Sequence, residues 1–256
     1  VQQTPFDDAD SGTSPGTAAP ISGGTLAMTV GGGAAWSVSA SGRRFDIQDN
    51  LAWSWIGGAT IDAWFHGKQT AAFGVIINDT LASTKTWFEA TGTTGMASIT
   101  YHAFGLTVSA TGVVTVIMNI PGTGPVNMII SDAGVAVANT DVYALIVFDS
   151  AAADSDDYIQ LYVNGARIVP ATYAGSTLGG LTLVWNQGTN AAFWCGGGTA
   201  SAATINNYIA WFEAADHAPD AAEVSDRWDQ LSADNDTEPS DAPADTDFMP
   251  CAAGDF

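Results

Sequence analysis

The sequence predicts an all-β protein: a two-sheet antiparallel β-sandwich or jelly roll, with one short C-terminal helix and extended arms at both ends. Short apolar or alternating runs, separated by Gly, Asn, Asp and Thr-Gly breaks, recur from about residue 25 to residue 212. An Asn-Gly pair stands between two of these runs. A chain of 256 residues is long enough for a sizeable core, and all-β sandwiches of this length are commonly single domains.

The stretch YIQLYVNGARIV, residues 158–169, predicts a β-hairpin. Asn164 and Gly165 tolerate the positive φ that both central positions of a type I′ turn require. In that register Val163 faces Ala166. One face then carries the apolar side chains and should point to the core, whereas the other carries Tyr158, Gln160, Tyr162 and Arg167. That second face is open to two interpretations, an ordinary cross-strand stacking pair or a binding surface.

The remaining elements follow from the same periodicity. We count about thirteen strands, among them the stretches 59–65, 97–104 and 181–186. One helix is expected in APDAAEVSDRWDQL, where Ala221, Val224, Trp228 and Leu231 form a single stripe. Pro219 stands where a first helical residue would, and Trp228 should anchor the helix to the sandwich.

Composition divides the chain into three parts. Residues 1–20 read as an N-terminal arm, residues 21–232 as the sandwich, and residues 233–256 as an acidic, Pro-rich tail that cannot fold alone. We expect Phe248, Met249 and Phe256 to anchor this tail, on its own domain or on a neighbouring chain. The N-terminal stretch lacks the charged and apolar regions of a signal peptide.

The charge balance restricts the partners. Six basic residues against 27 acidic ones give a formal net charge of −21. Such a surface repels nucleic acid and anionic membranes, and the sequence has no apolar run long enough to insert into a bilayer. A marine or halophilic origin would suit this charge, because salt screens the repulsion; simple solubility explains it equally well.

The last part of the sandwich resembles a known family. Residues 140–231 contain a strand ending in Asp149, a Tyr-Val-Asn-Gly hairpin at 162–165, an aromatic strand at 208–212 and a helix opening with Pro219, Glu223 and Val224. This order resembles the C-terminal half of laminin-G-like, concanavalin-A-like jelly rolls. The resemblance implies the fold and no catalytic residue. Some relatives bind Ca²⁺ at the sandwich rim, but no ligand can be carried over to this chain residue by residue.

Two sets of residues are candidate sites. Carboxylates around the loop before the hairpin could hold Ca²⁺ or form a plain solvated turn: Asp149, Asp154, Asp156 and Asp157. Aromatic and basic side chains could contact carbohydrate or another protein: Trp53, Trp55, Tyr158, Tyr162 and Arg167. We expect no catalytic residues, because only four acidic residues are Glu, none of them spaced as a catalytic pair, and the three His lie in unrelated contexts. No cofactor is expected apart from the candidate Ca²⁺.

These observations favour a non-enzymatic structural or adhesion module. Our first hypothesis is a decoration or fibre-type protein on the virion surface of a tailed virus from a marine or halophilic host. It would contact other copies of itself or other surface proteins and bind host glycans. The alternatives are a secreted carbohydrate-binding module of a salt-adapted microbe and a glycoside hydrolase of concanavalin-like fold. The expected location is a virion surface or the extracellular space.

Overall fold

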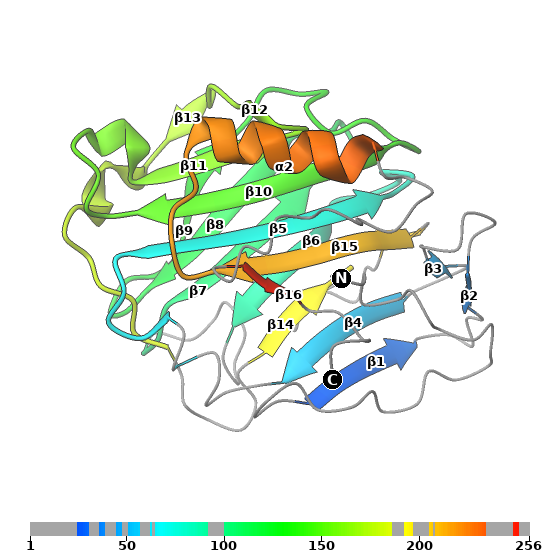
Figure 1. Ribbon diagram of the computed structural model, residues 1–256, viewed down its shortest axis with the longest axis horizontal. Coiled ribbons are helices and arrows are strands. Elements are labelled where there is room, and N and C mark those ends of the chain that lie inside the picture. Colours follow the sequence, from blue (N-terminus) through cyan, green and yellow to red (C-terminus); the bar gives the residue numbers. More distant parts are fainter. Residues whose placement is uncertain are drawn as a thin grey trace.

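The computed structural model describes residues 25–30, 36–38, 45–47, 51–56, 62, 65–91, 100–185, 192–196, 205–206, 208–233 and 248–250. These residues form two antiparallel sheets and a small β2–β3 ribbon (Figure 1). The larger sheet has the order β1-β4-β14-β6-β7-β8-β9-β13, and the smaller has the order β12-β11-β10-β5-β15-β16. The strands are β1 (Thr25–Val30), β2 (Trp36–Val38), β3 (Phe45–Ile47), β4 (Leu51–Ile56), β5 (Thr70–Asn78), β6 (Lys85–Thr91), β7 (Ala103–Val108), β8 (Val114–Ile120), β9 (Gly124–Ile130), β10 (Asp141–Asp149), β11 (Ile159–Val163), β12 (Ala166–Arg167), β13 (Thr172–Tyr173), β14 (Ala192–Cys195), β15 (Tyr208–Ala215) and β16 (Phe248–Pro250).

The core lies between the two sheets. In β5, alternate side chains from Ala71 to Ile77 enter the main core, where they meet residues of β6, β7 and β8 from the other sheet. The intervening residues Ala72 and Ile76 belong to a second cluster on the outer face of the smaller sheet. Strand β10 alternates in the same way. Two buried faces explain why both strands read as nearly continuous apolar runs rather than as a polar-apolar alternation.

The second cluster is covered by helix α2 (Ala221–Ala233), which runs along the smaller sheet in Figure 1. Val224 is 1% exposed, and the indole of Trp228 stacks on the ring of Tyr143 with 6.0 Å between centroids. The helix begins two residues later than the Pro219 position suggested. Asp220 is its N-cap, because its carboxylate accepts hydrogen bonds from the backbone N–H groups of Ala222 and Glu223.

The turn and the register of the predicted hairpin are confirmed, whereas Tyr158, expected on the outer face, packs against the main core. Asn164 and Gly165 have φ values of 50° and 77°, and Val163 pairs with Ala166. Ile159, Leu161 and Val163 lie in the main core, as their alternation predicted.

None of the helices in the described residues combines the length and the apolar character that a membrane span requires.

Three predicted strands differ from the structure. Asp62 and Phe65 are helical rather than extended, and the backbone N–H of His66 donates to the carbonyl of Asp62 at 2.8 Å. Strand β7 begins only at Ala103, after His102. Residues 181–185 are not a strand, although Leu183 and Trp185 are buried in the core.

The side chain of His102 is a buried group whose charge should affect stability. It is 4% exposed, its Nδ1 accepts a hydrogen bond from the backbone N–H of Val184 at 2.8 Å, and its buried Nε2 has no partner in the structure. Burial lowers the pKa of His102 from 6.5 to about 4. The folded protein therefore keeps this imidazole neutral at pH values where the unfolded chain already protonates it.

We expect the free energy of unfolding to fall as the pH falls, because the unfolded chain protonates His102 before the folded protein does. Protonation of the unfolded state begins near pH 6.5 and protonation of the folded state near pH 4, so stability is lost between these values, by up to about 3 kcal/mol. Urea unfolding at pH 7.0 and pH 4.5 would measure the loss. The control is His102→Asn, which retains an acceptor near Nδ1 and does not titrate. Parallel losses in both proteins would contradict the prediction.

Candidate functional site

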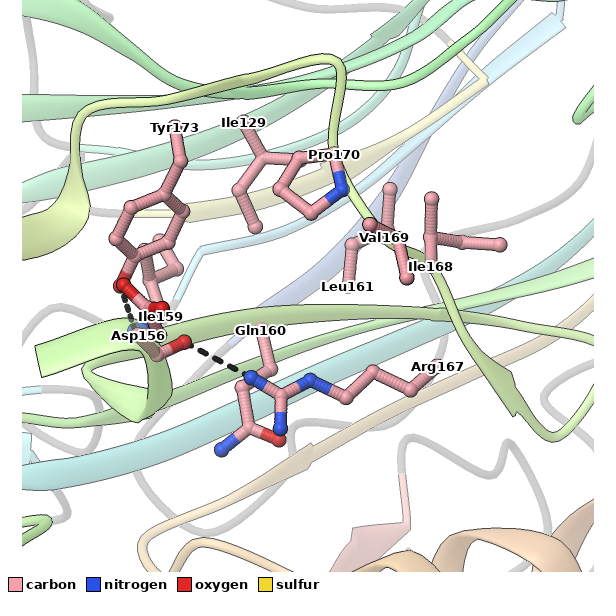
Figure 2. Close-up of a pocket in the computed structure, with 10 residues that line it drawn as sticks. All are labelled: Ile129, Asp156, Ile159, Gln160, Leu161, Arg167, Ile168, Val169, Pro170 and Tyr173. Atoms are coloured by element: carbon pink, nitrogen blue, oxygen red, sulfur yellow. Dashed lines mark hydrogen bonds between the residues drawn. The ribbon is translucent and has the colours of Figure 1, made fainter. Parts of the chain in front are cut away.

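A groove lies where corresponding edges of the two sheets meet. Strand β12 forms one edge of the smaller sheet, and β13, paired with β9, forms the edge of the larger one. The chain passes from one sheet to the other through residues 168–171. The groove encloses about 480 Å³ and is lined by the residues drawn in Figure 2: Ile129, Asp156, Ile159, Gln160, Leu161, Arg167, Ile168, Val169, Pro170 and Tyr173.

Local sequence explains why the edge stays open. The Asn-Gly turn starts β12, but this strand is only two residues long. After Arg167, the backbone N–H of Ile168 donates to the carbonyl of Leu161 at 2.8 Å. Pro170 then has no N–H to continue a ladder. The crossing segment therefore leaves the sheet, and Val169 is 85% exposed.

One side of the groove is apolar. Ile159 and Leu161 are fully buried beneath it, and Ile129 reaches it from β9 of the larger sheet. Pro170 and Val169 continue this lining, and the side chain of Val169 is exposed to solvent. Such a wall can take up an apolar part of a ligand.

Tyr173 supplies an aromatic ring that is held in place. Its hydroxyl donates to the carbonyl of Ser155 at 2.7 Å and accepts from the N–H of Ile159 at 3.4 Å. The ring packs on Gly175, where an added Cβ would lie 2.6 Å from the ring's Cζ. Burial raises the pKa of Tyr173, so the phenol is neutral at ordinary pH.

Arg167 supplies the cationic group. Its Nη2 donates to the carbonyl of Asp156 at 2.8 Å, and its Nη1 pairs with Oδ1 of Asp157 at 2.7 Å. The two residues lie in the short 3₁₀ turn Ser155–Asp157, which Asp154 caps by accepting from the N–H of Asp156. A guanidinium has five N–H donors, so three remain for a ligand at this partly exposed side chain.

The arrangement combines features common to small-ligand sites: an apolar wall, one fixed aromatic ring, and a few polar groups at the rim. Its single lining carboxylate residue is Asp156. Hydrolysis of a glycosidic bond ordinarily needs two carboxyl groups flanking that bond. The described lining contains one such group.

Of the residues predicted for carbohydrate or interface contact, Arg167 lies in the groove. Tyr158 is half-buried and packs against the main core. Tyr162 is 3% exposed and belongs to the cluster beneath α2, and its hydroxyl donates to Gln160 Oε1 at 2.7 Å. Trp53 and Trp55 lie in β4 opposite Cys195 and Phe193; their side chains are outside the described part of the structure.

The four candidate Ca²⁺ ligands are engaged separately. Asp149 accepts from the N–H of Ala151 at 3.0 Å, Asp154 caps the 3₁₀ turn, Asp157 pairs with Arg167, and Asp156 lines the groove. Among the described residues, no three acidic, His or Cys side chains gather as a metal site would require.

Of the predicted tail anchors, the structure describes only the backbone of Phe248 and Met249. Phe248 and Met249 are in β16, which pairs with Ala215 and Ala214 of β15, so this part of the tail forms the edge of the smaller sheet. Phe256 lies outside the described residues.

The sequence interpretation missed most of the groove. Tyr173, Ile129 and Pro170 come from different elements, and the predicted hairpin ended at residue 169. The signal that could have found part of it is Pro170, three residues after the end of the return strand at Arg167, because a proline there cannot donate to a ladder and so ends the pairing.

Comparison with known proteins shows which solved structures have a similar fold. No family model matches the chain, and no curated protein matches it. The receptor-binding domain of botulinum neurotoxin D matches with a TM-score of 0.56 at 11% identity, over 81% of this chain and 48% of that chain. The receptor-binding domain of the botulinum neurotoxin C/D mosaic matches with a TM-score of 0.54 at 10% identity, over 80% and 46%.

A third structure is a SAP-like pentraxin from Limulus polyphemus, with a TM-score of 0.44 and 11% identity over 63% of this chain and 70% of that chain. The chain spans a little under half the length of the two toxin structures. At these identities the likeness concerns the backbone alone. Together with the two antiparallel sheets, it shows that the chain has the fold of a concanavalin-like jelly-roll β-sandwich.

Proposed function

We propose that this protein is a non-enzymatic binding module that acts through surface contacts and binds glycans in the groove between β12 and β13. The observation that carries the proposal is the joint presence of a fixed tyrosine, a tethered arginine and an apolar wall in one space of about 480 Å³. One solved structure of similar fold, with a TM-score of 0.53 at 8% identity, is that of a botulinum neurotoxin type C protein whose cell entry depends on interaction with two ganglioside molecules. This chain covers 46% of it, which lends support only to the general type of function.

The proposed setting is the outside of a virion or cell. A net charge of −21 and small-residue-rich strands suit a module that faces solvent. Subunits of the same chain, or other surface proteins, are the proposed protein partners. A tailed virus of a salt-rich habitat stays our first choice of source, on composition alone.

Blocking the groove should abolish glycan binding. Val169 is 85% exposed and lines the groove, so Val169→Trp should fill the space without disturbing the core. On a glycan array, followed by titration of the best ligand, we expect at least a tenfold loss of affinity. The matched control is Val137→Trp, at a valine that is 54% exposed outside the groove lining. Absence of any glycan ligand, or equal binding by both variants, would contradict the proposal.

A further inference from the structure

Resting on the function proposed above, we infer the class of sugar: an uncharged pyranose with a methyl-ended substituent, such as a 6-deoxy or an N-acetyl group. The vicinal hydroxyls would lie at the Arg167–Asp157 pair, and the methyl group would lie against Pro170 and Val169. Acidic sugars would be disfavoured.

The charges around the groove argue against an anionic ligand. Asp157, beside the groove, neutralises Arg167 at 2.7 Å, and the lining itself contains one acidic residue, Asp156. Elsewhere in the described residues, Lys68, Lys85 and Arg227 are also paired with carboxylates. An acidic sugar would therefore meet no uncompensated positive charge in the described part of the chain, on a protein whose net charge is −21.

The same pair suits neutral hydroxyl groups. Each sugar hydroxyl donates one hydrogen bond and accepts others. Arg167 offers the N–H donors that its contacts with Asp156 and Asp157 leave over, and the Asp157 carboxylate can accept. Because Asp157 and the Asp156 carbonyl already hold the guanidinium, little further ordering would be needed on binding.

The apolar wall accounts for the methyl group. In Figure 2, Ile129 and Pro170 lie on one side of the groove and the guanidinium of Arg167 on the other. Val169, 85% exposed in the structure, would lose contact with water when a ligand methyl covers it. Burial of one such carbon corresponds to about a fourfold gain in affinity.

The test is a titration of the full chain, by ligand-observed NMR, with matched sugars. L-fucose against L-galactose isolates the 6-deoxy methyl, N-acetylglucosamine against glucose isolates the acetyl group, and glucuronic acid against glucose isolates the charge. We expect one of the methyl-bearing sugars to bind about fourfold or more tightly than its counterpart, and glucuronic acid to bind more weakly than glucose. Which methyl-bearing sugar gains affinity identifies the substituent.

Two variants locate the effect. Arg167→Lys should weaken binding of the neutral sugar, and Val169→Trp should abolish it, with Val137→Trp unchanged. Tighter binding of glucuronic acid than of glucose, or equal binding within both methyl pairs, would overturn the inference while leaving glycan binding intact. Absence of binding by every sugar, on the titration and the array alike, would overturn the proposed function as well.

Discussion

Replacing Phe73 with alanine is expected to lower the free energy of unfolding by about 3–5 kcal/mol. Phe73 is 1% exposed in β5, at the centre of an aromatic cluster that joins the two sheets. Its ring centroid lies 5.3 Å from that of Phe65, 5.4 Å from that of Phe88 and 5.2 Å from that of Phe104. Alanine would remove all of these contacts and leave a cavity that surrounding strands, fixed by their ladders, can fill only in part.

Urea unfolding of the full chain would measure this loss as a lower midpoint with an unchanged slope. The control is Val169→Ala, at an exposed valine, for which the change should stay within about 0.5 kcal/mol. A loss below about 1 kcal/mol for Phe73→Ala would mean that the cluster contributes little to holding the sheets together.

Strands with strong local signals could be predicted from the sequence. The hairpin follows from Asn164-Gly165, because two positive φ values fix both the turn and the register of its strands. The apolar runs of β5 and β10 follow from burial on both faces. In each case the information is contained within about ten consecutive residues.

The errors arose where interactions that the apolar-polar alternation does not report decide the local structure. The stretch 59–65 alternates like a strand, yet Asp62 and His66 meet at 2.7 Å between side chains, as residues four apart do on a helical turn. Leu183 and Trp185 fill the core from an irregular segment, in which the backbone of Leu183 bonds to Lys68 and Gly67 rather than to a neighbouring strand. Periodicity alone cannot distinguish these cases.

The candidate site was even harder to predict from the sequence. Ile129 and Tyr173 meet only because β9 and β13 pair at the sheet edge. Tyr162 was selected because it shares a face with Arg167, and that face proved to be covered in part by α2. Which half of a sheet face a helix covers depends on the whole fold, so only Arg167 could be predicted from the hairpin pattern.

The second large effect is expected at the ion pair beneath α2. Arg227, on the helix, donates from Nε and Nη2 to Oε2 of Glu213 in β15 at 2.9 and 2.6 Å. The other carboxylate oxygen, Oε1, accepts from the hydroxyl of Tyr143 at 2.5 Å, and burial, followed by this carboxylate, raises the pKa of Tyr143 well above 10. Gly74 makes room for the cluster, since a Cβ there would lie 2.8 Å from Oε1.

Arg227→Met should therefore lower the free energy of unfolding by about 3–5 kcal/mol, because it leaves the 1% exposed carboxylate of Glu213 without its cation. Adding Glu213→Gln to this variant removes the uncompensated charge and should recover part of the loss. The matched control is Lys68→Met, whose partner Asp216 lies 2.8 Å away at a partly exposed position; its expected cost is at most about 1 kcal/mol. Unfolding in urea distinguishes these outcomes. Equal losses for Arg227→Met and Lys68→Met would mean that water reaches Glu213 beneath the helix, and the outer face of the smaller sheet would then be less firmly covered than its contacts indicate.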